Sequence, residues 1–229
     1  MCIRDSYQLA LNKSNTGGNY LNDELDKIIY KKLADSRSLV IEDYQYIFST
    51  LISLFPEKKK ISVLEVGGGH NPIFSYIKKI LSKERFKKIN FYVLERKSVC
   101  KLVKHKEKNL KYIYSLKKIK KINYCFFTAS AQYIFDFEKL MSSIAKLRPE
   151  YFGILKIFSY KGRNDFYSVQ TNMRPNLFPV KIFSINNLIN LFSVYKYKIV
   201  FINNVYANQN YRLDFKEKIF KTDLIFRRT

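Results

Sequence analysis

The stretch from Ile61 to Pro72 constrains the fold of this chain more than any other part of its sequence. It reads ISVLEVGGGHNP, a largely β-branched apolar run that contains Glu65 and turns into three consecutive glycines. Such a loop lets bare backbone approach a ligand, because glycine has no Cβ to hold the ligand away. A second apolar run, Ile89–Leu94, ends in Glu95 about one strand–helix unit later. This layout is typical of nucleoside-cofactor sites in open α/β sheets.

From residue 61 onward, apolar runs of strand length alternate with segments of helical periodicity. The runs predict strands at residues 61–66, 89–95, 110–114, 123–129, 151–158, 198–203 and 223–227. Helices are predicted near residues 72–82, 136–147 and 184–192, and a helix or loop is predicted around residues 98–106. This alternation predicts an α/β fold with a Rossmann-like, doubly wound, mostly parallel sheet of seven strands. The last two strands are expected to form an antiparallel hairpin at one edge.

The first part of the chain reads differently from the rest. Residues 1–6, MCIRDS, resemble the translation of a sequencing-library end and are treated as foreign. Residues 7–19 predict a polar turn or flexible lead-in, and residues 22–33 and 41–54 predict helices. We therefore expect a helical N-terminal extension over residues 7–57 and a cofactor-binding domain over 58–229. No apolar run reaches the roughly 18–20 residues that a membrane helix needs, and no secretory signal is visible.

Composition narrows the class of protein. Cys100 and Cys125, outside the foreign start, belong to no CxxC pair, which favours a reducing, cytoplasmic compartment and no zinc site. Only two histidines are present, which argues against a multi-histidine metal centre. The formal charge of +23 is compatible with an anionic partner such as RNA. We favour codon bias as its origin, because Lys, Asn, Ile, Tyr and Phe are all abundant.

The glycine loop fits the nucleoside cofactor S-adenosylmethionine (SAM) better than it fits phosphate-containing nucleotides. The dinucleotide fingerprint G-x-G-x-x-G requires a third glycine where Pro72 stands, and the G-K-[ST] of a Walker A loop is absent. Leu64–Gly69 resembles the first motif of class I SAM-dependent methyltransferases, and Glu95 resembles their ribose-binding acid. Glu65 lies within a strand expected to be buried, so it should bind loop amides or the cofactor's amino group.

Three later segments extend this resemblance: TASAQYI at 128–134, SVQ at 168–170 and PVKIFS at 179–184. In this order they resemble a family of SAM-dependent methyltransferases found among bacterial surface-polysaccharide genes, from about Gly17 to the C-terminus. The sequence departs from the family at Glu65, where Asp is usual. It also departs at Lys156-Ile157, where the fifth strand usually ends in Asp-Arg. Lysine lacks the bidentate geometry of arginine, so this departure bears on the substrate more than on the fold.

The glycine loop and the resemblance together imply a set of site residues. The predicted cofactor-binding residues are Glu65, Gly67, Gly68, Gly69, His70, Glu95, Ser130 and Gln132. The predicted substrate-binding residues are Tyr133, Lys156 and Gln170. His70 and Tyr133 are candidates for a proton acceptor, although the sequence assigns no catalytic residue, and no metal ligand is predicted.

These features predict an enzyme that transfers a methyl group from SAM to a small-molecule or carbohydrate-type acceptor, on oxygen or nitrogen. Two alternatives remain open. The basic charge favours an RNA methyltransferase, but Ser130–Tyr133 stands where an amine-methylating N/D-P-P-[FYW] motif would lie. The other alternative is a SAM-fold binding protein without catalysis. Oxidoreduction with NAD is disfavoured by Pro72.

Overall fold

The computed structural model describes residues 7–12, 27, 47–48, 50–52, 59–69, 73–103, 107–173, 176–206 and 218–229. The helices are α1 (Tyr7–Asn12), α4 (Phe74–Ile80), α5 (Lys83–Phe86), α6 (Lys97–Leu102), α7 (Phe137–Ala145), α8 (Ile185–Val194) and the 3₁₀ turn η1 (Ala131–Tyr133). The strands are β1 (Ile61–Val66), β2 (Ile89–Leu94), β3 (Leu110–Ile113), β4 (Tyr124–Thr128), β5 (Tyr151–Tyr160), β6 (Phe166–Met173), β7 (Asn176–Ser184), β8 (Tyr197–Tyr206) and β9 (Phe220–Arg228).

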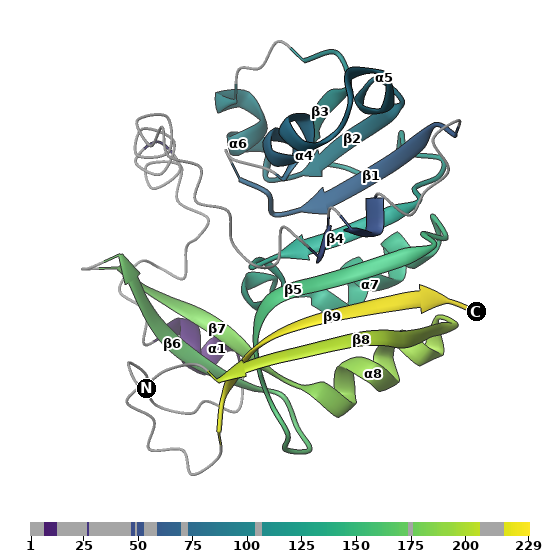
Figure 1. Ribbon diagram of the computed structural model, residues 1–229. Coiled ribbons are helices and arrows are strands. Elements are labelled where there is room, and N and C mark those ends of the chain that lie inside the picture. The colour runs from purple at the N-terminus through teal and green to yellow at the C-terminus, as the bar shows by residue number, and fades with distance from the viewer. Residues whose placement is uncertain are drawn as a thin grey trace.

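The strands form one mixed sheet with a parallel centre. Strands β3, β2, β1, β4 and β5 lie side by side in this order and run parallel. Strand β9 then pairs antiparallel with β5, and β8 pairs antiparallel with β9 (Figure 1). The predicted fold class and the predicted pairing of the last two strands are therefore confirmed.

Two strands extend the sheet beyond the expected seven. Strands β6 and β7 form an antiparallel hairpin, and β7 pairs in parallel with the end of β5 at Ser159 and Tyr160. The hairpin projects beyond the carboxyl ends of β1 and β4 (Figure 1). Strand β5 is longer than predicted. It continues past a bulge between Ile154 and Ile157, and it pairs with β9 both before and after this bulge.

Helices cover both faces of the sheet. One core contains Phe137 and Met141 of α7 and Phe192 of α8, packed on the sheet. The core of the opposite face contains Phe74 and Ile77 of α4, together with Phe86, Phe48 and Ile52. Strands β1 and β4 lie between these layers and are buried along most of their length, as central parallel strands are.

The N-terminal part departs from its prediction at the start. Residues 7–12, expected to be a polar turn or flexible lead-in, form α1, which buries Ala10 and packs on β6 and β7. Residues 47–48 and 50–52 are helical as predicted, and Phe48 and Ile52 are buried. Residues 1–6 and most of the predicted extension lie outside the described residues. Among the described helices, none is long and apolar enough to cross a membrane.

Candidate functional site

The glycine loop leaves β1 at the carboxyl edge of the sheet and has left-handed backbone. Gly67 has φ +73° and Gly69 has φ +57°, a region that other residues adopt at a cost. A Cβ on Gly67 would lie 2.4 Å from the Cβ of Ser130, so the space beside Gly67 is already filled. A Cβ on Gly69 would meet no described atom within 4 Å. Gly67 thus packs against the loop after β4, whereas a side chain at Gly69 would contact none of the residues that the structure describes.

Two side chains, from the ends of neighbouring strands, form hydrogen bonds with the amide and the carbonyl of Gly69. The amide of Gly69 donates to Oε1 of Glu95 over 2.7 Å, and the hydroxyl of Tyr112 donates to the Gly69 carbonyl over 2.9 Å. The amide of Arg96 donates to Oε2 of Glu95 over 3.2 Å. Glu95 therefore meets the glycine loop, whereas Tyr112 of β3 was not identified from the sequence. No sequence signal distinguished it from the other 17 tyrosines.

Glu65 lies beneath the loop and is 2% exposed. Its Oε2 accepts the amide of Ile73, at the start of α4, over 2.9 Å. A Cβ on Gly68 would lie 2.8 Å from the Glu65 carboxyl carbon, so the loop covers this side chain closely. Burial raises the pKa of Glu65 to about 8, and the Ile73 hydrogen bond lowers it only in part. The carboxyl group is therefore largely protonated at neutral pH.

The loop after β4 contributes Ser130 and Gln132 to the same edge. Ala129 has φ +52°, which turns the chain sharply at the end of β4. The hydroxyl of Ser130 donates to the carbonyl of Val66, the last residue of β1. Gln132 is 4% exposed, and its Oε1 has no hydrogen-bond partner among the described residues. Buried polar groups rarely lack a partner, so this amide oxygen is a candidate ligand contact.

Two of the predicted substrate residues meet each other. The hydroxyl of Tyr133 in η1 donates to Oε1 of Gln170 on β6 over 2.8 Å. The 3₁₀ turn η1 packs against β7 and β5, so the hairpin lies beside the turn that follows β4. The sequence named both residues, but the hairpin that brings them together was not predicted.

Lys156 lies at the bulge of β5, and His70 lies outside the described residues. Lys156 has φ +55°, and its amide donates to Oδ1 of Asp223 on β9 over 2.7 Å. The neighbouring residue Leu155 accepts the amide of Ala129, which places Lys156 level with the end of β4. The bulge therefore positions Lys156 at the carboxyl edge of the central sheet.

The described residues contain no group of three His, Cys, Asp or Glu side chains that could hold a metal ion. This arrangement instead offers a left-handed glycine backbone, a strand-end carboxylate and a buried side-chain amide. Such groups suit a nucleoside or an amino-acid moiety, since both present hydroxyl and amine donors together with carboxylate acceptors.

Solved structures of SAM-dependent methyltransferases share this fold. The N1-methyltransferase of 1,6-didemethyltoxoflavin from Burkholderia thailandensis, solved with its substrate and S-adenosylhomocysteine, is 12% identical, with 90% of this chain and 87% of that chain covered and a TM-score of 0.51. A SAM-dependent methyltransferase from Aquifex aeolicus is 14% identical, with coverage of 91% and 100% and a TM-score of 0.53. The amino pentose methyltransferase CalS10 from Micromonospora echinaspora, solved with SAM, is 9% identical, with coverage of 88% and 97% and a TM-score of 0.52.

Sequence comparison adds no relative to these structures, because no protein-family model and no curated protein matches the chain. Identities of 9–14% establish a common fold and leave the chemistry to the residues of the site. The chain therefore has the α/β fold of class I SAM-dependent methyltransferases.

Proposed function

We propose that this protein is an enzyme that transfers a methyl group from SAM to a small-molecule or carbohydrate-type acceptor, on oxygen or nitrogen. The proposal rests on the hydrogen bonds that Glu95 and Tyr112 form with the backbone of Gly69, at the carboxyl edge of β1, β2 and β3. Ligands of open α/β sheets bind at this edge. The left-handed Gly69 has no described atom within 4 Å of the place of a Cβ, so a ligand could approach the backbone there.

The residues present fit the proposed cofactor. Glu95 ends β2, where a carboxylate can accept hydrogen bonds from the two ribose hydroxyls of SAM. The loop Gly67–Gly69 would receive the ribose and methionine parts. Oε1 of Gln132, which has no partner within the described part of the chain, is a buried acceptor. SAM supplies an activated methyl group, so the protein's task is to align the acceptor and remove its proton where needed.

The acceptor would lie beyond the ends of β4 and β5. Tyr133, Gln170 and Lys156 lie on elements at this edge, and we assign them to the acceptor side. The hydroxyl proton of Tyr133 is directed to Gln170, so Tyr133 serves as a contact in this arrangement. His70 remains the candidate base.

Structural neighbours support a small acceptor. They include a methyltransferase for 1,6-didemethyltoxoflavin, an amino pentose methyltransferase and coclaurine N-methyltransferase. A carbohydrate acceptor agrees with the amino pentose enzyme and with the resemblance to methyltransferases of surface-polysaccharide gene clusters. A cytoplasmic location remains part of the same proposal.

The net charge is compatible with RNA as the acceptor, but the position of one lysine cluster argues against it. A cavity of about 530 Å³ is lined by Lys78, Lys83, Lys87 and Lys108, among other residues. Its lining includes the segments just before β2 and β3, so it opens at the amino edge of these strands. An anion bound there would lie on the edge opposite the glycine loop, and would not present a base to the site.

Titration calorimetry tests the cofactor assignment. We expect micromolar binding of SAM and S-adenosylhomocysteine, weakened at least tenfold, or about 1.4 kcal/mol, by Glu95→Ala. Glu95→Gln keeps an oxygen for the Gly69 amide but removes the charge. A clear loss in this variant would therefore report contact with the ligand rather than support of the loop.

Glu84→Ala is the matched control, because Glu84 is an exposed acid on α5. Its affinity should equal that of the unsubstituted protein. Folded protein that binds neither SAM nor S-adenosylhomocysteine would refute the proposed function. Binding that Glu95→Ala leaves unchanged would retain the cofactor but remove Glu95 from the site.

A further inference from the structure

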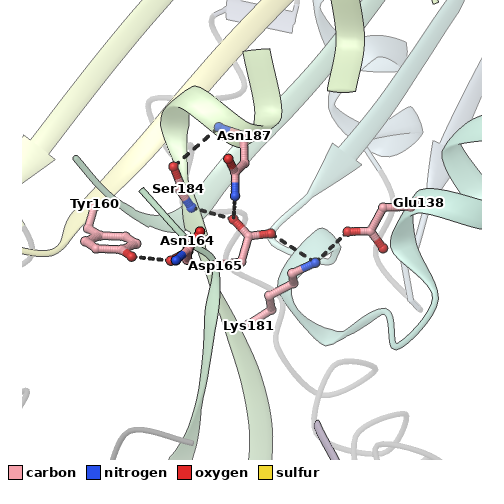
Figure 2. Close-up of polar contacts among 7 residues, drawn as sticks. All are labelled: Glu138, Tyr160, Asn164, Asp165, Lys181, Ser184 and Asn187. Atoms are coloured by element: carbon pink, nitrogen blue, oxygen red, sulfur yellow. Dashed lines mark hydrogen bonds and ion pairs between the residues drawn. The ribbon is translucent and has the colours of Figure 1, made fainter. Parts of the chain in front are cut away.

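A buried lysine connects the β6–β7 hairpin to the main domain. Lys181 of β7 is 5% exposed, and its Nζ lies 2.6 Å from Oε1 of Glu138 in the first turn of α7. The same Nζ lies 3.1 Å from Oδ2 of Asp165, in the connection between β5 and β6. Figure 2 shows the ammonium group between the two carboxylates. One cation thus joins α7, the connection between β5 and β6, and β7.

The second carboxylate continues the network into α8. Oδ1 of Asp165 accepts the amide of Ser184 over 2.8 Å, and the Ser184 hydroxyl accepts the amide of Asn187 as the N-cap of α8 (Figure 2). The Ser184 hydroxyl also donates to the carbonyl of Gly162 over 2.7 Å. The Ser184 amide therefore holds one oxygen of Asp165, and Lys181 binds to the other.

Electrostatics make the cation necessary to this arrangement. Burial alone would lower the pKa of Lys181, but the hydrogen bond with Glu138 and the charge of Asp165 outweigh burial and raise it. Lys181 therefore stays charged at neutral pH. Without it, Glu138 and Asp165 would face each other as like charges at the base of the hairpin, which favours separation of the hairpin from α7.

The hairpin held in this way carries a predicted acceptor residue. In the register of the hairpin, Tyr167 lies opposite Lys181, and Gln170 lies opposite Phe178 further out on the same two strands. The ring of Tyr167 lies 5.9 Å from the Lys181 ammonium and 5.8 Å from the ring of Tyr7 on α1. The base of the hairpin thus fixes the strand that presents Gln170 to Tyr133.

We propose that Lys181 is a positioning residue for the acceptor side. Its ion pairs with Glu138 and Asp165 hold the β6–β7 hairpin at the place where Gln170 meets the hydroxyl of Tyr133. The inference rests on the proposed function, which identifies this side as the acceptor side. It goes beyond that function by assigning a role to a residue remote from the glycine loop.

Fluorine NMR of protein labelled with 3-fluorotyrosine tests this role at a single residue. The resonances of Tyr133 and Tyr112 are assigned from Tyr133→Phe and Tyr112→Phe. In Lys181→Met, we expect the Tyr133 resonance to shift or broaden beyond its linewidth. The Tyr112 resonance, which reports on the glycine loop, should not change. Lys181→Arg keeps the cation and should move the Tyr133 resonance back toward its original position.

Two further variants make the result decisive. Lys78→Met removes a lysine from the exposed pair with Glu107 and should leave both resonances unchanged. Glu138→Gln is the milder variant if Lys181→Met does not fold, because Glu138 is half-exposed, and it should affect Tyr133 in the same direction. Amide exchange over 166–184 should accelerate about tenfold in Lys181→Met and stay unchanged over 61–69.

An unchanged Tyr133 resonance in both Lys181→Met and Glu138→Gln would overturn the proposal. Equal changes at Tyr133 and Tyr112 would also overturn it, because they would show general loosening of the fold. Titration of S-adenosylhomocysteine into the same samples separates the two hypotheses. Its affinity should stay within about threefold in Lys181→Met, whereas absence of binding to the unsubstituted protein would refute the proposed function without altering the Tyr133 result.

Discussion

The two sides of the carboxyl edge are built by different kinds of contact. On the glycine-loop side, side chains bind backbone groups, as Glu95 does with Gly69 across 26 residues of chain. On the hairpin side, the contacts that join the hairpin to η1 and α7 are between side chains, as in Tyr133 with Gln170 across 37 residues and Lys181 with Glu138 across 43. Backbone groups are always present, so the first kind needs one suitable residue. The second kind needs two residues and a fold that brings them together.

The glycine-loop side should be the more sensitive to backbone strain. Gly67→Ala forces a left-handed alanine whose Cβ would overlap Ser130. We expect a loss of about 4 kcal/mol in the free energy of unfolding, together with loss of SAM binding. Gly69→Ala is the control, since its added Cβ meets no described atom, and should cost about 1 kcal/mol. Urea unfolding measures both, and equal losses would show that contact with Ser130 is unimportant.

Glu65 should make the free energy of unfolding depend on pH. Its pKa rises from 4.5 to about 8 on folding, so the folded state holds a proton that the unfolded state releases. Stability should therefore fall as the pH rises from about 4.5 to about 8, by an amount on the order of a few kcal/mol.

Glu65→Gln keeps an acceptor for the Ile73 amide and should remove this dependence. The variant should be close to the unsubstituted protein near pH 5 and more stable near pH 8, as measured by urea unfolding at each pH. The exposed Glu84→Gln should follow the unsubstituted protein at both values. Parallel pH profiles for Glu65→Gln and the unsubstituted protein would contradict the raised pKa.

Two helix caps compare the hairpin side with a helix at the amino edge of the sheet. Ser184 is fully buried, caps α8 and also donates to Gly162, whereas Ser82 is exposed and only caps α5. Ser184→Ala should cost about 1.5 kcal/mol and Ser82→Ala about 0.5 kcal/mol, in thermal or urea unfolding. The reverse order would mean that the network around Asp165 does not depend on Ser184.

The smallest expected effect concerns the contact between η1 and the hairpin. Tyr133→Phe removes the hydrogen bond to Gln170 and should lower the free energy of unfolding by about 1 kcal/mol. Tyr114→Phe provides the control, because Tyr114 is 65% exposed, and should change it by less than about 0.5 kcal/mol. If Tyr133→Phe lowers the free energy of unfolding by no more than Tyr114→Phe does, this hydrogen bond contributes nothing to the attachment of the hairpin.

The sequence predicted the fold class and the strand ends that form the glycine-loop side. Apolar runs marked seven strands, and a helix was correctly predicted to begin near Ser184. The apolar pattern predicted neither β6 nor β7, although SVQ and PVKIFS within them had been noted for their resemblance. Gln170 and Lys181 are polar residues that interrupt the apolar pattern of these strands. Each binds a side chain on another element, so its position does not follow the alternation of apolar and polar residues that marks a strand.

Some contacts had no signature in the sequence. Tyr112 is one tyrosine among 18, and only its place on β3 beside β2 brings it to Gly69. Lys156 was expected at a strand end, but it occupies a left-handed bulge within a longer strand. A bulge depends on how β5 pairs with β9, and this pairing involves residues about 70 positions further along the chain.

The sequence by itself determined that the chain forms an α/β sheet with a glycine loop and a carboxylate at adjacent strand ends. These features follow from local properties, namely the period of apolar residues and the backbone freedom of glycine. Only the tertiary structure decided that Tyr112 would meet Gly69 and that Lys181 would lie between Glu138 and Asp165. The physical reason is that such pairs depend on strand register and packing, which distant parts of the chain fix jointly.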